Sequence, residues 1–431
     1  MKKIFISIII GCLVLLSSCT DGFDNMNTST TSLLQDNLSM ESVFAREIWK
    51  GMSADYQRNY NLYDDEYAHY FANCTSGFNT GYFEYRDDWA NCGWWEHYDE
   101  RQKEFLDIDS ICGSATGKVA MKSMNDIFNC FMWLRVTDRW GDIPYKGCSK
   151  KTPVAYMSQK DIYLDLLRRL DVDCTAIANY SGTQYDPGEN DLIYGYGSSD
   201  DLSTRVNRWK KFGYSLMLRM AVRISNADKT DAQTYAAKAV AGGVFTSIAD
   251  NAHVTCDASI WEDYYDRIIA SWNNATTDMD FMNYMQGGTS SYTRANTLDP
   301  RAPLWFTPGK FGYVGLQNGL TALPSGYSWK NYATINVSDK GFFKFDESVD
   351  ANNRLYYPIM NYSEVCFLQA EAALRGLIGG DPESFYEAGI TASMQEVVAN
   401  SGTAKISDTD IANYINGLPT CALTNTQAAF T

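Results

Sequence analysis

Amphipathic helical segments that follow one another in pairs restrict the fold of this chain more than any other feature. In the stretch 115–139, apolar residues recur every three or four positions, which predicts a helix with a single apolar stripe. Gly141 and Pro144 end this helix, because glycine accepts a left-handed helix end and proline blocks continuation. Similar patterns predict helices at 41–57, 93–110, from Ser158 onward, 205–226, 230–242, 361–376 and 383–400.

Helix pairs without strong strand signals predict a mainly α fold, a tetratricopeptide-like solenoid of helical pairs with large loop-rich inserts. A few short strands are expected inside the inserts, for example at 341–345. We therefore treat 40–431 as one helical domain with aromatic-rich inserts near 55–98 and 250–360. The first insert holds fourteen aromatic residues among 44, far above the 14% of the whole chain. Because the helices carry their own apolar stripes, these rings are not all needed for a core.

The composition excludes several classes of function. With 36 Lys and Arg against 52 Asp and Glu, the net charge is -16, which repels phosphate backbones, so no nucleic-acid partner is expected. Only three histidines are present, His69, His97 and His253, which leaves few ways to build a zinc site or a Ser-His-Asp relay. No Asp-x-Asp-x-Asp-Gly loop occurs, so we expect neither a metal ion nor another cofactor.

The N-terminus has the pattern of a lipoprotein signal peptide. Lys2 and Lys3 precede a thirteen-residue apolar run, 4–16, which is shorter than the roughly 20 residues that cross a bilayer. The run ends in Leu16-Ser17-Ser18-Cys19, which resembles the lipobox of bacterial lipoproteins. The resemblance implies that residues 1–18 are removed and that Cys19 is lipidated and anchors the protein to the membrane. We interpret the polar stretch 19–39 as a tether.

The cysteines indicate no metal or redox motif. Of eleven, the signal peptide takes Cys12 and the lipid takes Cys19, so nine remain, an odd number. No Cys-x-x-Cys pair occurs, and Cys130 and Cys366 lie in apolar helical stretches, where a thiol acts as a small hydrophobic group. We expect mainly buried, inert thiols and leave any disulfide pairing open.

Several stretches resemble the SusD/RagB family of nutrient-binding outer-membrane lipoproteins. The segment 133–145 (WLRVTDRWGDIPY) is similar to a helix end and turn of that family. The other matching stretches are 208–223 with 239–245, 362–373 with 386–394, and the triplet Asp299-Pro300-Arg301. Family members usually continue with further C-terminal helices, whereas this sequence ends in a low-complexity stretch, so we expect it to be C-terminally short.

The resemblance implies a tetratricopeptide-like scaffold that carries ligand-binding loops on one face. It also implies an outer-membrane location, on the cell surface through the lipid anchor, and a SusC-like TonB-dependent transporter as partner. In that family the lipoprotein covers the mouth of the transporter, hands over the captured nutrient and has no catalytic activity. The function expected for this chain is therefore the capture of a glycan and its delivery to the transporter.

The matching stretches also have a purely structural interpretation, which we favour for them. Asp138, Arg139 and Asp142 lie at a helix end, where they are expected to cap backbone groups and pair with one another. Glu371 and Arg375 have the spacing of a surface ion pair on a helix. We therefore expect the matching stretches to belong to the scaffold and the inserts to carry the binding site.

Sugars offer apolar faces that stack on aromatic rings and hydroxyl groups that need polar partners. Both inserts contain Trp and Tyr next to Arg, Asn and Asp, although rings such as Trp95 and Tyr98 also have the spacing of inward-packing residues. The candidate ligand-binding residues are Tyr82, Arg86, Trp89, Asn91, Trp94, Tyr292, Arg294, Trp305, Tyr327 and Trp329.

Three alternatives remain open at this stage. The same surface would also suit a peptide ligand. A lipid-anchored glycoside hydrolase would use two carboxylates about 5–9 Å apart, and acidic runs occur at Asp64-Asp65-Glu66 and Glu262-Asp263, although such runs usually mark solvated faces. A structural envelope protein would bind no glycan or peptide at all.

Overall fold

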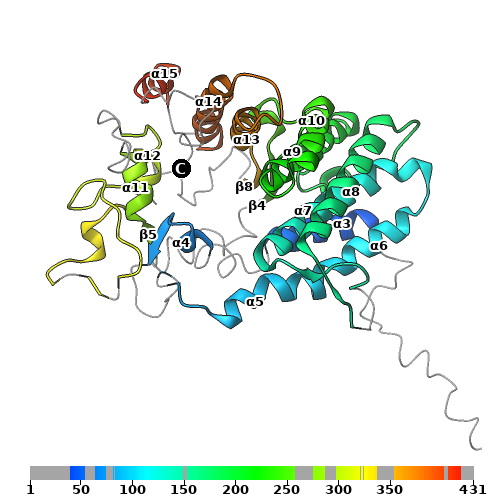
Figure 1. Ribbon diagram of the computed structural model, residues 1–431, viewed down its shortest axis with the longest axis horizontal. Coiled ribbons are helices and arrows are strands. Elements are labelled where there is room, and N and C mark those ends of the chain that lie inside the picture. The colour runs from blue at the N-terminus through cyan, green and yellow to red at the C-terminus, as the bar shows by residue number, and fades with distance from the viewer. Residues whose placement is uncertain are drawn as a thin grey trace, which may run out of the picture.

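The computed structural model describes residues 39–53, 64–73, 81, 83–148, 153–257, 275–286, 298–320, 322–323, 325–336, 354–401 and 406–418. The expected signal peptide, Cys19, the tether and the expected strand at 341–345 lie outside these residues. A helical scaffold occupies one side of the molecule, and short helices, strands and loops from the inserts occupy the other (Figure 1). No helix among the described residues is long and apolar enough to cross a membrane.

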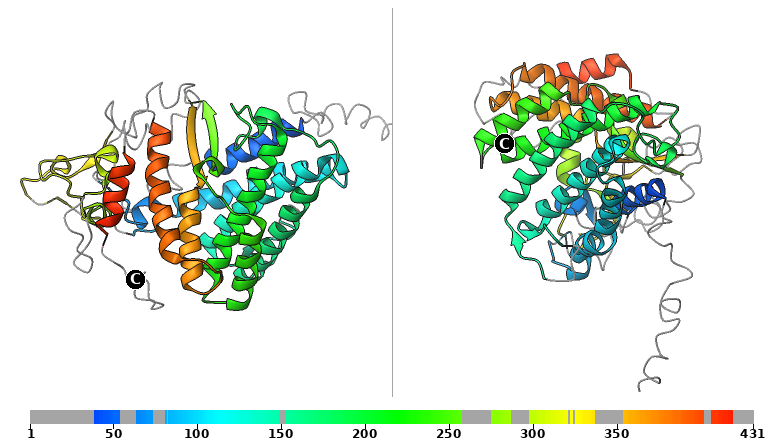
Figure 2. Two further views of the ribbon diagram at one scale, coloured as in Figure 1. Left: turned by 90° about the horizontal axis from the view of Figure 1, so that it is seen from above. Right: turned by 90° about the vertical axis from the view of Figure 1, so that its right-hand side faces the viewer.

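The scaffold consists of helices that pack against their neighbours in the sequence. Helix α7 packs on α8, α8 on α9, α9 on α10, and α13 on α14, while α13 also contacts α9 (Figure 2). This arrangement confirms the predicted helical pairs. The scaffold elements are α3 (Met40–Ser53), α5 (Asp87–Trp95), the π-helix η4 (Glu96–Arg101), α6 (Gln102–Cys112), α7 (Val119–Trp140), α8 (Gln159–Asn179), α9 (Leu202–Ile224), α10 (Lys229–Gly242), α13 (Tyr362–Leu374), α14 (Pro382–Ser401) and α15 (Asp408–Asn416).

Local sequence signals fix the ends of these helices. The side chains of Ser158 and Asp201 accept hydrogen bonds from backbone N–H groups three residues later, at 3.1 Å and 2.8 Å, and so begin α8 and α9. Helix α7 ends at Gly141, whose φ of 74° is a left-handed conformation that glycine adopts without strain. The expected helix at 93–110 is instead divided by η4, where Arg101 and Glu96 form an ion pair at 3.1 Å inside the fold.

The main hydrophobic core lies between α7, α8 and α9. Phe128 of α7 and Trp209 and Phe212 of α9 are completely buried there. Gly213 lets α9 approach α8, because a Cβ atom at this position would lie 2.4 Å from the sulfur of Cys174. Burial of large apolar side chains contributes about 1.5–3 kcal/mol each, so this contact is a major source of stability.

The described strands are short, as predicted, and they form two-stranded antiparallel pairs, one of which, β2 with β3, lies outside the inserts. β4 (Ala252–Asp257) pairs with β8 (Arg354–Met360) beside the scaffold, and β2 (Ile143–Pro144) pairs with β3 (Tyr156–Met157). Within the inserts, β1 (Phe71–Asn73) pairs with β5 (Ala275–Thr277), and β6 (Phe306–Thr307) pairs with β7 (Thr334–Ile335). The inserts also contain the short helices α4 (Asp65–Tyr67), α11 (Met279–Met285) and α12 (Ala302–Trp305).

Four described cysteines agree with the expectation of buried thiols, whereas Cys92 and Cys148 are only partly buried. Cys112, Cys130, Cys174 and Cys366 are buried and form no disulfide. Burial raises the pKa of Cys112 to about 11, so this thiol stays protonated and unreactive at neutral pH.

Glu396 of α14 makes stability depend on pH. Burial raises the pKa of its carboxyl group from 4.5 to about 7, so between these values the folded state binds more protons than the unfolded state. The free energy of unfolding therefore falls as the pH rises from about 4.5 to 7. We predict that Glu396→Gln removes this fall and is about 1–3 kcal/mol more stable than the wild type at pH 8.

The measurement is urea unfolding at several pH values, with the difference between wild type and variant plotted against pH. Glu383→Gln, at an exposed position in the first turn of the same helix, serves as the control and should leave the profile unchanged. A Glu396→Gln profile parallel to that of the wild type would contradict the prediction.

Candidate functional site

Parts of the two inserts form one compact unit, which we call the insert lobe and define as the described residues of 64–73, 81 and 275–336. The pairing of β1 with β5 joins them. The amide of Asn318 donates to the backbone oxygen of Glu66 at 2.9 Å, and the rings of Tyr70 and Phe281 meet edge to face at 5.2 Å. Residues far apart in the sequence therefore build one surface, to the left of the scaffold in Figure 1.

The insert lobe has its own small core, which is separate from the core of the scaffold. Met282, Met285, Ala302, Phe306, Ala333 and Ile335 are buried in it. Trp305, a predicted ligand-binding residue, is only partly buried and packs against this core. The lobe thus holds its shape without using every ring that it contains.

The triplet Asp299-Pro300-Arg301 attaches the insert lobe to the scaffold. The guanidinium of Arg301 pairs with the buried carboxylate of Asp299 at 2.7 Å and donates to the hydroxyl of Ser393 on α14 at 2.7 Å. It also lies 5.2 Å from the centre of the Trp305 ring, within cation–π range. This matching stretch is therefore structural, as the sequence analysis favoured.

Exposed aromatic side chains are concentrated in the inserts. Of the nine large aromatic residues that are exposed in the described chain, seven belong to the stretches 55–98 and 250–360. Outside these stretches the exposed rings are Tyr156 and Phe367. The seven are Tyr70, Phe83, Tyr85, Trp95, Tyr284, Phe311 and Tyr327.

One group of rings combines predicted with unpredicted residues. Phe311 meets Tyr327 at 5.3 Å and Tyr332 at 5.6 Å, both edge to face, while 48% of Tyr327 and 40% of Phe311 remain exposed. Trp329 lies two residues from Tyr327 and has the ammonium of Lys330 5.4 Å from its ring centre. We call Phe311, Tyr327, Trp329 and Tyr332 the ring cluster. The sequence analysis missed Phe311 and Tyr332, because contact between residues about twenty positions apart has no local signature.

The predicted residues Arg86, Trp89 and Asn91, at or in α5, differ in how exposed they are. Trp89 is only 7% exposed, and the guanidinium of Arg86 lies 4.3 Å from its ring centre. The amide of Asn91 is exposed and donates to Asp87 at 3.1 Å. These three residues lie close together, but the ring of Trp89 is largely covered.

Trp94 faces the scaffold, where it packs against Tyr98, Trp140 and Tyr156 with ring centres 4.8–6.5 Å away. Its neighbour Trp95 is 55% exposed, so the interpretation that Trp95 packs inward does not fit, whereas Tyr98 is partly buried and donates to the oxygen of Pro144. Tyr82, Tyr292 and Arg294 lie outside the described residues.

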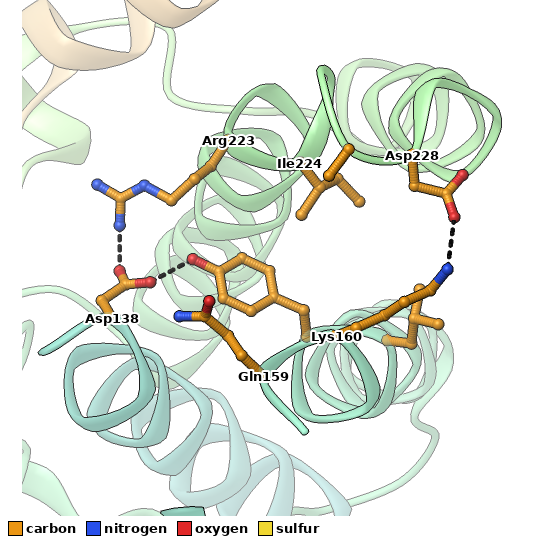
Figure 3. A pocket seen from close by; sticks show the side chains of 9 residues that line it. Asp138, Gln159, Lys160, Arg223, Ile224 and Asp228 are labelled. Atoms are coloured by element: carbon orange, nitrogen blue, oxygen red, sulfur yellow. Dashed lines mark hydrogen bonds and ion pairs between the residues drawn. The ribbon is translucent and has the colours of Figure 1, made fainter. Parts of the chain in front are cut away.

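A cavity of about 480 Å³ opens where the ends of α7, α8 and α9 meet (Figure 3). Its apolar wall includes Leu164 and Ile224. Asp138 accepts hydrogen bonds from the hydroxyl of Tyr163 and from the guanidinium of Arg223. Asp138 and Arg223 lie on the side of the cavity opposite Lys160 and Asp228 (Figure 3).

The charged side chains that line this cavity already pair with one another. Burial raises the pKa of Asp138, and the partners Tyr163 and Arg223 offset only part of that rise. On the far wall, Lys160 pairs with Asp228 at 3.4 Å. A polar ligand would have to break these pairs, so we assign the cavity to the scaffold rather than to the candidate site.

The matching stretches are joined to one another by ion pairs. Arg219 of α9 binds both carboxylate oxygens of Glu364 on α13, at 2.6 Å and 2.7 Å, one turn before Arg223 binds Asp138. The predicted pair between Arg375 and Glu371 is confirmed at 2.6 Å. These stretches therefore hold three helices together.

One expectation about these motifs is corrected. Asp138, Arg139 and Asp142 do not pair with one another, because neighbouring positions at a helix end point in different directions. Arg139 instead pairs with Asp64 at 2.9 Å, and Asp142 accepts the backbone N–H of Gln159 at 2.9 Å. Of the two expected roles only capping is observed, and Asp142 caps the start of α8 rather than the end of α7.

The chain belongs to the SusD-like family, described as Susd and RagB outer membrane lipoprotein, whose pattern matches residues 23–420. Members of this family are nutrient-binding outer-membrane lipoproteins, and they are binding proteins rather than enzymes. The family assignment confirms the resemblance seen in the sequence. No protein with a curated function matches the chain.

Solved structures show the same helical, tetratricopeptide-like fold. A chitin-binding protein has a TM-score of 0.73 and 22% identity, with 90% of this chain and 81% of that chain covered. A SusD-like protein from Bacteroides thetaiotaomicron has a TM-score of 0.66 and 24% identity, with 83% and 70% covered. A SusD homologue from Bacteroides vulgatus has a TM-score of 0.67 and 22% identity, with 84% and 71% covered.

We predict that Asp138→Ala lowers the free energy of unfolding by about 1–3 kcal/mol, because it leaves Arg223 and the Tyr163 hydroxyl without their acceptor. Chemical unfolding followed by circular dichroism measures the change. Asp109→Ala, which breaks an exposed pair with Lys122, is the control and should cost less than about 1 kcal/mol. Equal losses in the two variants would refute the structural role of Asp138.

Proposed function

We propose that this chain is a lipid-anchored outer-membrane protein that captures a glycan with the rings of its inserts and delivers it to a SusC-like TonB-dependent transporter. The observation that carries the proposal is the concentration of exposed rings in the inserts, seven of nine among the described residues. Single exposed rings are normal on protein surfaces, but their concentration in two stretches of the chain, and in the ring cluster above all, favours a binding role.

The chemistry of the ring cluster suits a carbohydrate. Rings that meet edge to face are held in fixed orientations, so their free faces are ready to stack on the apolar face of a sugar. Lys330 beside Trp329, and the exposed amide of Asn91 near α5, supply hydrogen bonds for sugar hydroxyl groups. The net charge of -16 repels polyanionic chains, which favours a neutral glycan.

The predicted residues keep their proposed roles to different degrees. We propose that Tyr327 and Trp329 stack on a ligand and that Arg86 and Asn91 hydrogen-bond it. Trp89, Trp94 and Trp305 are more covered, so we propose that they support the binding surface by packing beneath it. Tyr82, Tyr292 and Arg294 remain predicted ligand-binding residues.

Family membership and the lipoprotein pattern of the N-terminal sequence support the delivery step. We propose that residues 1–18 are a signal peptide, that Cys19 bears the lipid, that 19–39 are a tether and that 40–431 form one domain with two inserts. A tether of this kind would keep the domain on the cell surface beside its transporter, and the protein would need no catalytic residues or cofactor.

A neutral chitin oligosaccharide is the first probe to use, because one structural neighbour is named a chitin-binding protein. We predict that Tyr327→Ala and Trp329→Ala each weaken its binding about two- to tenfold, as expected for the loss of one ring contact. Isothermal titration calorimetry on the full chain in detergent gives the affinities, and a panel of neutral glycans extends the test if chitin oligosaccharides do not bind.

Phe367→Ala is the matched control, because this exposed ring belongs to α13 and lies outside both inserts. Unchanged affinity for every bound glycan in Tyr327→Ala and Trp329→Ala would contradict the proposal. Binding of peptides and of no glycan would favour the peptide-capturing alternative, and release of reducing sugar would favour a hydrolase. A chain that binds neither class would be a structural envelope protein.

Delivery is tested separately by purification from detergent-solubilised outer membranes. We predict that the wild-type chain retains a TonB-dependent transporter and that Cys19→Ala lowers the amount recovered, because the variant loses its anchor. Tyr327→Ala should retain the transporter, since it alters the ligand surface only. Absence of any transporter from the wild-type preparation would refute delivery while leaving glycan capture intact.

A further inference from the structure

One histidine and two aspartates from distant parts of the chain meet where the two inserts join. His69 lies just before β1, while Asp278 and Asp280 follow β5. The antiparallel pairing, with Phe71 opposite Thr277, brings the three side chains together. One ligand atom from each lies within 4.8 Å of the others, so the three residues could hold one metal ion.

The distances are those of donor atoms that share an ion. Nδ1 of His69 lies 3.5 Å from Oδ1 of Asp278 and 3.6 Å from Oδ2 of Asp280. A charge-assisted hydrogen bond would be shorter, at about 2.7–2.9 Å. Donor atoms bound to one metal at about 2.0–2.2 Å lie roughly 3.0–3.6 Å apart for tetrahedral to octahedral geometry. The arrangement therefore fits an ion better than it fits hydrogen bonds.

Two buried atoms of this group have no hydrogen-bond partner among the described residues. One is Nδ1 of His69 and the other is Oδ2 of Asp278. The side chain of Asp278 is only 1% exposed, and its other oxygen accepts the backbone N–H of Asp280 at 2.7 Å. A buried carboxylate oxygen without a partner is costly, and within the described residues no lysine or arginine pairs with Asp278. A cation bound by this carboxylate would offset the cost of burying its negative charge.

We propose that His69, Asp278 and Asp280 bind a divalent first-row transition-metal ion of the Zn²⁺ type, which ties the first insert to the second. An imidazole nitrogen with two carboxylates suits such ions, whereas Ca²⁺ and Mg²⁺ prefer an all-oxygen set. Three protein ligands leave a position for water. The expectation of no metal rested on the small number of histidines and on the absence of a contiguous Asp-x-Asp-x-Asp-Gly loop, and neither can reveal ligands that only the fold brings together.

The metal would stabilise the insert lobe. It would bridge His69, two residues before β1, and Asp278, directly after β5. These two strands hold the inserts together. The free energy of metal binding would add to the stability of the folded lobe, because the unfolded chain does not keep the three ligands close. Metal binding is read out directly, so this inference stands or falls independently of glycan capture.

The test uses the full chain without a polyhistidine tag, stripped with a chelator and titrated with Zn²⁺ by calorimetry. We expect one ion per chain and a higher thermal midpoint in its presence. His69→Ala and Asp280→Asn should each weaken Zn²⁺ binding at least about tenfold, as for loss of one ligand contact, and should abolish the rise. Both side chains are partly exposed, at 40% and 48%, so these variants should fold.

His253→Ala is the matched control, because it removes a histidine outside the group and should bind Zn²⁺ like the wild type. Circular dichroism without metal confirms that each variant is folded. The inference is overturned if the folded wild type binds no Zn²⁺, or if His69→Ala and Asp280→Asn bind it unchanged. An equal affinity for Ca²⁺ and Zn²⁺ in the wild type would likewise overturn it, since it would exclude an imidazole ligand.

Discussion

Two arginines one turn apart on α9 connect three helices of the scaffold. Arg219 holds Glu364 of α13, and Arg223 holds Asp138 of α7, so three helices from distant parts of the sequence are fixed around one charged seam. The apolar core between α7, α8 and α9 supplies the bulk of the burial, while the ion pairs set how the helix ends meet. Because these charged side chains already pair with one another, we assign this part of the molecule to the scaffold and not to ligand binding.

The rigid scaffold leaves the inserts free for another task. Their unit has a separate core and a two-stranded join, and it is attached to the scaffold through Arg301 at α14 and through Asp64 at α7, so it keeps its form with few of its rings buried. Rings that are not needed for packing remain at the surface. This division between a packed scaffold and ring-bearing inserts accounts for the unusual aromatic content of the chain, and it is the basis of the proposed glycan capture.

The sequence was informative wherever the structural signal is local. Apolar stripes and caps such as Ser158 and Gly141 predicted the long helices to within a few residues, and the pair Glu371–Arg375 formed as its spacing required. The break at η4 was not predicted, because a π-helical turn depends on buried partners such as Arg101 and Glu96.

The candidate site was only partly predictable for the same reason. Composition pointed to the stretches that carry most of the exposed rings, but which of two adjacent residues, Trp94 or Trp95, faces outward depends on how α5 docks on the scaffold. Likewise, the contact of Phe311 with Tyr327 and the approach of Asp278 to His69 arise from chain topology alone.

Hydrogen–deuterium exchange of the full chain, with and without a saturating glycan that it binds, tests the central claim most directly. Our account predicts slower exchange in 305–336 and 83–98, with no change in α7–α10, because the ligand would touch the inserts and leave the scaffold as it is. Protection confined to the scaffold, around the cavity at Asp138 and Arg223, would contradict the account and would move the binding site to the charged seam.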